Sequence, residues 1–154
     1  MTRECARAPV GARAHAHRAP KQSNMSLIGS IRKEETCAIY PYDGPVDGFR
    51  FLSYLEHHLL PKLCDGDVVV MDNLRVHHIP DVKEILARGG ARPLYLPPYS
   101  PERNPIEEVW SPFKRYFRSA EPRNISEIVD TMKRAWAEIT TENLHAYFTH
   151  AGYD

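Results

Sequence analysis

Apolar and polar positions follow regular patterns from residue 25 onward, and the first elements they predict are two strands and a helix. Met25–Ile31 and residues 36–42 are short, β-favourable segments bounded by polar residues, which predicts two strands joined as a hairpin. Residues 43–45, Asp-Gly-Pro, break the pattern, and Asp47 suits the N-cap of a helix that Pro61 or the turn after it should end. Apolar positions of that helix recur every three or four residues: Phe49, Leu52, Leu55 and Leu59.

The middle of the chain predicts a strand–helix–strand unit. Val68–Met71 is a continuous apolar run rich in β-branched residues, which is typical of a strand buried on both faces in a parallel sheet. A short helix over residues 81–88 should stop at Gly89-Gly90, and a strand follows at residues 94–96. A right-handed crossover is expected for such a unit.

The remainder of the chain is predicted to be mostly helical. A stiff, proline-rich loop leads to Asn104-Pro105, a capping residue followed by proline at the first helical position. Pro112 should kink or interrupt the helix that starts there, because proline lacks the N–H group that the helix needs. Helical patterns over residues 126–139 and 142–150 close the chain.

Length and composition narrow the class of protein. A chain of 154 residues fits one domain. Its apolar runs fall far short of the roughly 18 residues that a membrane-spanning helix requires, so no membrane partner is expected. Three cysteines at wide spacing argue against a disulfide framework and against a cysteine-based zinc site. We therefore expect a globular protein of the reducing cytoplasm.

Charge is distributed unevenly although it sums to zero, with 20 Lys and Arg against 20 Asp and Glu. Residues 1–24 form a basic polar leader with five basic residues and one acidic residue, a balance of +4, so the rest of the chain carries −4. The leader has no apolar stripe at helical spacing, which argues against a transit peptide. Any contact with DNA should therefore be local rather than spread over the whole surface.

Two acidic residues stand where strands of the predicted sheet give way to loops. Asp72 directly follows Val68–Met71, and Glu107 lies in the first turn of the helix after the next strand. Each has an ordinary explanation, since Asp72 could cap a turn and an acidic first turn compensates the helix dipole. Both transitions belong to the same edge of one sheet, and we expect the two side chains to reach a shared cation. Converging carboxylates suit Mg²⁺, which prefers oxygen ligands.

Several sequence motifs cluster around these acids: VVVMDN at residues 68–73 followed by His77, LPPYSP at residues 96–101, NPIE at residues 104–107, and Trp110 with Lys114. Together they resemble the DDE-superfamily transposases of bacterial insertion sequences, in their mariner-like branch with a ribonuclease-H-like catalytic domain. The 34 residues between Asp72 and Glu107 match the family's spacing between its second and third catalytic acids.

The resemblance implies a fold, a chemistry and a set of site residues. The fold is α/β, with a ribonuclease-H-like mixed sheet flanked by helices. The chemistry is cleavage and transfer of DNA strands in transposition, with Mg²⁺ (or Mn²⁺) as cofactor. Asp72 and Glu107 correspond to two of the family's three catalytic, metal-binding acids, and Asn73, His77 and Asn104 would support them.

The chain also departs from the family. There, a first catalytic aspartate ends the central first strand, upstream of an Arg-x-Pro-x-Gly segment that here occupies residues 7–11. No residue of this chain fills that place, and we interpret Asp43 and Asp47 as turn and cap residues. The family's N-terminal helix-turn-helix is missing too. Residues 25–154 are therefore interpreted as the C-terminal part of a catalytic domain, truncated before its first strand, weak in metal binding and inactive alone.

Other side chains keep two interpretations. Three basic residues on the helix after Glu107 could contact DNA phosphates by charge alone, or could form a plain solvated face: Lys114, Arg115 and Arg118. Tyr99 could pack against the protein or stack on a nucleobase. Trp110 is interpreted as a packing residue rather than a stacking group.

Two alternative functions stay open beside the inactive transposase fragment. One is a non-catalytic DNA-binding remnant that inhibits full-length transposase. The other is an active enzyme completed by an upstream segment. DNA, as transposon ends and target, is the expected partner, and the expected protein partner is a second copy of the chain or a full-length transposase.

Overall fold

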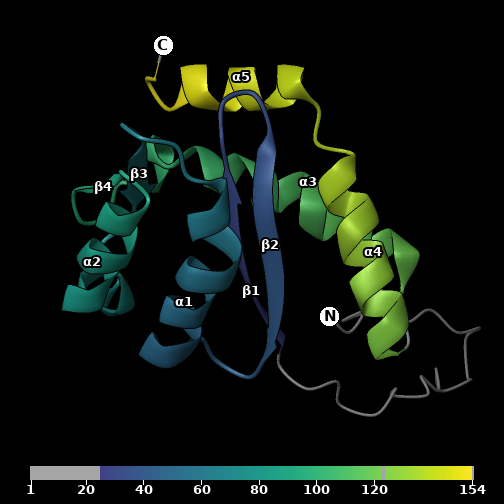
Figure 1. Cartoon of the computed structure of the whole chain (residues 1–154). Coiled ribbons are helices and arrows are strands. Elements are labelled where there is room, and N and C mark those ends of the chain that lie inside the picture. The colour runs from purple at the N-terminus through teal and green to yellow at the C-terminus, as the bar shows by residue number, and fades with distance from the viewer. Residues whose placement is uncertain (1–24, 123, 154) are drawn as a thin grey trace, which may run out of the picture.

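The computed structural model of the chain describes residues 25–122 and 124–153, so the leader at residues 1–24 and the segment at residues 7–11 lie outside the described residues. The helices and strands, in chain order, are β1 (Met25–Ile31), β2 (Thr36–Asp43), α1 (Gly48–Tyr54), β3 (Val68–Met71), α2 (Pro80–Arg88), β4 (Arg92–Tyr95), α3 (Pro105–Ala120), α4 (Ile125–Ala137) and α5 (Thr141–His150). Figure 1 shows the β1–β2 hairpin in the centre, with α1, α2 and the β3–β4 pair on one side, α4 on the other, and α5 across one end.

The predicted hairpin is confirmed. β1 and β2 pair antiparallel, with Ile28 opposite Tyr40 and an irregularity in the register near the end of β1. Alternate residues of a strand face opposite sides of a sheet, and the two faces of this hairpin pack against different clusters. Ile28 and Ala38 contact the cluster that holds α1 and α2, whereas Leu27 and Ile39 contact the cluster formed by α3 and α4. The hairpin is therefore a layer between two groups of helices.

The helix after the hairpin begins as predicted, and three of its four predicted apolar positions lie in the core: Leu55 and Leu59 are buried, and Leu52 packs against the same cluster. The Asp47 carboxylate accepts a hydrogen bond from the Arg50 N–H at 2.9 Å, which confirms the cap. Phe49, expected in the core, is 82% exposed, whereas Phe51 and Tyr54 are buried. Residue 49 precedes residue 51 by two positions, which is more than half a helical turn, so the two side chains point to opposite sides.

The same helix is longer than α1 alone. A π-helical turn at Leu55–Leu59 and a 3₁₀ turn at Leu60–Lys62 continue it before the connection to β3. Tyr54 ties it to the hairpin, because its hydroxyl donates to Ser30 Oγ at 2.8 Å. Burial is the main reason that the pKa of Tyr54 is raised above its ordinary value. The long helical segment thus packs against one face of the hairpin.

β3 and β4 form the predicted parallel pair, with Met71 opposite Tyr95 and α2 as the crossover. The expectation that β3 is buried on both faces is wrong, because Val68 is 40% exposed and Met71 is the buried residue of the strand. Within the described part of the chain, β3 pairs with β4 alone and β1 with β2 alone. Exposure is highest at Val68, the first residue of β3, and burial is reached at Met71, its last.

The two sheets meet at one ion pair and share one core. Arg32, which follows β1, donates to both carboxylate oxygens of Asp67, which precedes β3, at 3.0 and 2.6 Å. The Arg32 guanidinium also donates to the Lys62 carbonyl at 2.9 Å. Partly buried residues from both sheets, Ile28 and Tyr95 among them, pack on the same cluster of α1 and α2 side chains. The antiparallel and parallel parts of the expected mixed sheet are thus present as separate neighbours.

The C-terminal helices form the second group of helices, on the other side of the hairpin. Pro112, expected to kink or interrupt the helix after Asn104, does not interrupt it, since α3 runs from Pro105 to Ala120 with Pro112 inside it. A kink at Pro112 stays a prediction. Proline removes one backbone hydrogen bond from a helix, and the buried side chains of Val109 and Phe113 hold the segment against its neighbours. None of the helices in the described ranges combines the length and apolar character that crossing a membrane requires.

Candidate functional site

The carboxyl end of the parallel pair is where the sequence places its candidate chemistry. Asp72 is the first residue after β3. The preceding carbonyl, that of Met71, accepts a hydrogen bond from the Leu96 N–H at 2.8 Å. The loop that leads from β4 toward α3 therefore starts beside Asp72, as expected for strands that end at the same edge of a sheet.

Asp72 uses one carboxylate oxygen for local contacts. Oδ1 accepts a hydrogen bond from the Leu74 N–H at 3.2 Å, so the turn-capping explanation is confirmed. The same oxygen lies 2.8 Å from His77 Nδ1. The side chain is 42% exposed, and no hydrogen bond to Oδ2 occurs within the described ranges. One oxygen is thus fixed by the turn while the other stays available.

His77 and His78 are held against β4 by Tyr95. The Tyr95 hydroxyl donates to the His77 carbonyl at 2.9 Å, and the Tyr95 ring stacks on His78 with centroids 4.4 Å apart. His78 Nε2 in turn hydrogen-bonds Asn73 Oδ1. Burial raises the pKa of Tyr95 above its ordinary value. The sequence analysis did not identify Tyr95 as a site residue. The only signal in the sequence was that Tyr95 is an aromatic residue on β4, the neighbour of the strand that precedes Asp72.

The His77 side chain is mostly buried, at 15% exposure, and its ring packs on Phe51 with centroids 4.6 Å apart. His77 Nδ1 hydrogen-bonds the Asp72 backbone carbonyl at 3.0 Å, in addition to its 2.8 Å contact with Asp72 Oδ1. The structure therefore brings His77 and Asn73 together with Asp72 in one short segment. Whether they act in catalysis stays a prediction.

Glu107 lies in the first turn of α3 with its side chain exposed. Its N–H donates to the Asn104 carbonyl at 3.0 Å, so Asn104 starts the helix as predicted, although the Asn104 side chain makes no capping hydrogen bond. Within the described residues the Glu107 carboxylate has no hydrogen bond or ion pair, and none links it to Asp72. Both oxygens of Glu107 are therefore available to a ligand.

The donor set fits a divalent cation only in part. Among residues 25–122 and 124–153, no group of three His, Cys, Asp or Glu side chains gathers in a way that could hold a metal ion. Asp72 and Glu107 do supply the hard carboxylate oxygens that Mg²⁺ prefers. Mg²⁺ usually takes one or two protein carboxylates and completes its shell with water and substrate phosphates. These two carboxylates alone would therefore supply only part of the shell of such an ion.

The candidate DNA-binding residues form an exposed stretch of α3. Lys114, Arg115 and Arg118 are all exposed, and Arg118 Nε donates to the Lys114 carbonyl at 3.2 Å. Trp110 packs edge-on against Phe113 with centroids 5.8 Å apart, so its role as a packing residue is confirmed. The contacts of the three basic residues are compatible with both interpretations, phosphate binding and a solvated face.

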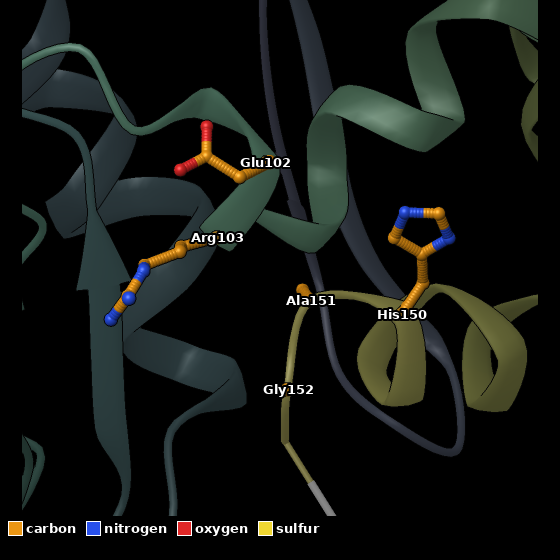
Figure 2. Close-up of a pocket in the computed structure, with 5 residues that line it drawn as sticks. All are labelled: Glu102, Arg103, His150, Ala151 and Gly152. Atoms are coloured by element: carbon orange, nitrogen blue, oxygen red, sulfur yellow. The ribbon is translucent and has the colours of Figure 1, made fainter.

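A shallow hollow of about 410 Å³ lies between the turn at Pro101–Arg103 and the C-terminal turn. Its lining residues are Glu102, Arg103, His150, Ala151 and Gly152. Figure 2 shows the three long side chains pointing apart rather than toward a common centre. The hollow is therefore not assembled as an ion-binding site. The C-terminal turn is fixed to this loop by the Tyr153 hydroxyl, which donates to the Arg103 carbonyl at 3.0 Å.

Comparison with known proteins identifies the family of the chain and its fold. Residues 1–129 match the family model described as DDE superfamily endonuclease. The fold is similar to the Mos1 strand transfer complex, with TM-score 0.69 at 16% identity over 96% of this chain and 46% of that one. It is also similar to a pre-cleavage Mos1 transpososome, with TM-score 0.68 at 13% identity over 96% of this chain and 47% of that one. No curated protein matches in sequence.

These comparisons have two consequences. The expected ribonuclease-H-like α/β fold, with sheets flanked by helices, is confirmed. The chain spans about half the length of the two Mos1 chains that it matches.

Proposed function

The chain belongs to the DDE superfamily endonucleases, and from this premise we propose that it forms part of the catalytic domain of a bacterial insertion-sequence transposase. DDE superfamily endonucleases generally use divalent metal ions. The proposal rests on the arrangement at the carboxyl end of the β3–β4 pair. There, Asp72 stands beside the start of the loop that leads to Glu107.

In this proposal Asp72 and Glu107 are two of the acids that hold Mg²⁺ or Mn²⁺. Such an ion, when bound, supplies positive charge that offsets charge developing on a phosphodiester under attack. Two observations support this role: Asp72 Oδ2 and both carboxylate oxygens of Glu107 make no hydrogen bond within the described residues. His77 fixes the other Asp72 oxygen, and Asn73 and Asn104 shape the turns that present the two acids.

DNA is the proposed substrate. The two similar structures are described as a strand transfer complex and a transpososome. In this chain the exposed basic residues of α3 would contact backbone phosphates by charge, and the acids would face the strand that is cut. Transposon ends and target DNA are the proposed partners, together with a second copy of the chain or a full-length transposase.

We infer that the chain is inactive by itself because its site and its sheet are both incomplete. The β1–β2 and β3–β4 sheets cover the same core, and the Arg32–Asp67 pair joins them, yet each has two strands in the described ranges. A further strand between β1 and β3 would pair both free edges and could end in a third carboxylate. Two carboxylates alone should hold an ion weakly.

The split sheet favours one alternative over the other. An inhibitory remnant needs no particular sheet geometry, whereas completion by an upstream segment requires free strand edges that can accept it. Within residues 25–122 and 124–153, β1 and β3 each have one edge that pairs with no other strand. Exposed edges are also templates for unwanted pairing. Sequencing the DNA upstream of the Met1 codon tests this directly, because completion requires an encoded apolar strand that ends in Asp.

Metal binding tests the two acids. We expect the purified chain to bind Mn²⁺ weakly in the presence of a DNA duplex, measured by loss of the EPR signal of the free ion. Asp72→Asn and Glu107→Gln should each weaken binding at least about tenfold. Glu108→Gln is the matched control, since Glu108 is the next residue on α3 and is exposed like Glu107. Equal binding by wild type and Asp72→Asn would contradict the assignment.

Nicking of supercoiled plasmid tests the inference of inactivity. The chain alone should leave the plasmid intact with Mg²⁺ or Mn²⁺. Metal-dependent nicking that disappears in Asp72→Asn would overturn the inactivity and would retain the site. Nicking that persists in Asp72→Asn and in Glu107→Gln would instead overturn the site.

A further inference from the structure

Tyr99 is a residue that the packing of the fold leaves without a role. Its side chain is 100% exposed, the highest value among the exposed large hydrophobic residues of the described chain. The sequence left open whether this ring packs against the protein or binds a ligand. Full exposure excludes packing, so the ring is available to something outside the chain.

The backbone at Tyr99 is in a conformation that residues with a Cβ rarely adopt. Its φ is 58°, and Glu121 is the other non-glycine residue with a positive φ in the described ranges. The left-handed region brings Cβ too close to the following carbonyl oxygen, and such strained residues cluster at sites that bind ligands. At Tyr99 no burial of the ring compensates for the strain.

The loop that carries Tyr99 is anchored at both ends. On one side the Leu96 N–H donates to the Met71 carbonyl at 2.8 Å, next to Asp72. On the other side the Tyr153 hydroxyl donates to the Arg103 carbonyl at 3.0 Å. Prolines on both sides of the tyrosine fix their own φ angles near −65°. The ring is thus presented by a stiff support, which lowers the entropy lost when a ligand binds.

We propose that Tyr99 stacks on an unpaired or terminal nucleobase of a DNA strand at the edge that carries Asp72 and Glu107. The inference deepens the proposed function and rests on it. A tyrosine ring stacks on any base, because every base has a π-face. Bases inside a duplex already stack on one another, so an unpaired or terminal base is the one that can reach the ring. Arg103, exposed four residues further along the same loop, would supply positive charge for the adjoining phosphate.

The test uses the full chain and two DNA probes of the same sequence at low ionic strength. One probe is a blunt duplex, and the other carries a short single-stranded 3′ overhang with 2-aminopurine, whose fluorescence is quenched by stacking. Tyr99→Gly removes the ring and accepts the positive φ, whereas Tyr99→Phe keeps the ring. Tyr40→Ala is the control, because it removes a partly exposed ring from β2, in the other sheet. Circular dichroism verifies that each variant is folded.

We expect wild type, Tyr99→Phe and Tyr40→Ala to quench the overhang probe, and Tyr99→Gly to bind that probe about tenfold more weakly without quenching. All four proteins should bind the blunt duplex equally. Unchanged quenching in Tyr99→Gly, or an equal loss on both probes, overturns the stacking role and leaves the proposed function standing. Failure of wild type to bind either probe overturns both proposals.

Discussion

The ion pair between Arg32 and Asp67 should be a main stabilising contact between the two sheets. Arg32→Ala removes two hydrogen bonds to a carboxylate and one to the Lys62 carbonyl, and leaves Asp67 with the Cys64 N–H at 2.7 Å. Exposed ion pairs contribute about 0.2 to 1 kcal/mol, and hydrogen bonds to charged groups about 1.5 to 3 kcal/mol. The two side chains are 28% and 23% exposed, so an intermediate cost of about 2 kcal/mol is expected.

The size of this loss can be checked by thermal unfolding followed by circular dichroism. For a chain of this length about 2 kcal/mol corresponds to a fall of roughly 4 to 8 °C in Tm. Arg88→Ala is the control, because Arg88 forms a pair with Glu56 at 2.9 Å whose side chains are 57% and 44% exposed. That variant should lose less than about 0.5 kcal/mol. If Arg32→Ala melts no lower than Arg88→Ala, the joint between the sheets does not stabilise the fold.

The pH dependence gives a second check on the same pair. Burial raises the pKa of Asp67, but the Cys64 N–H and the Arg32 guanidinium outweigh it, so that the pKa lies below its usual value. A carboxyl with a lowered pKa in the folded state stabilises the fold fully above its unfolded pKa, near 3.9. The contribution is lost as pH falls through the lower, folded value. The difference in Tm between wild type and Arg32→Ala should therefore shrink below about pH 4, and a constant difference would refute the assignment.

Three further substitutions test local geometry by urea unfolding. Gly90 and Gly66 both have a positive φ, but an added Cβ would overlap the Asp65 side chain at Gly90 and would meet open space at Gly66. Gly66→Ala should therefore cost about 1 kcal/mol from backbone strain and Gly90→Ala about 2 to 3 kcal/mol; equal losses would contradict the steric argument. Tyr95→Phe removes the hydroxyl that donates to the His77 carbonyl and should cost about 1 kcal/mol, whereas an unchanged midpoint would show that this bond does not hold the segment.

Elements with strong local signals could be predicted from the sequence. Met25–Ile31 forms a strand that packs against a cluster on each face, Gly89-Gly90 ends α2, and Asn104-Pro105 starts α3. In each case the signal is carried by the residues themselves: side-chain periodicity, the backbone freedom of glycine, or the fixed φ of proline. The motifs that place the chain among the DDE superfamily endonucleases are likewise local, and residues 1–129 match that family.

The candidate site was predictable only as a list of residues. The sequence could name Asp72, Asn73 and His77, and their mutual contacts lie within one short segment. It could not identify Tyr95, because that contact depends on the parallel register that sets β4 beside β3. Nor could it choose between packing and stacking for Tyr99, since exposure is a property of all the neighbours together.

Periodicity, capping residues and motif spacing by themselves determined where strands and helices begin, and where the acidic residues stand relative to them. The tertiary structure alone decided that Phe49 faces solvent while Phe51 is buried, and that α3 continues through Pro112. It also decided that the strands form two separate pairs joined by Arg32 and Asp67. The physical reason is that local rules act through the backbone within a few residues, whereas burial and pairing depend on which distant segments fill the space around a side chain or strand edge.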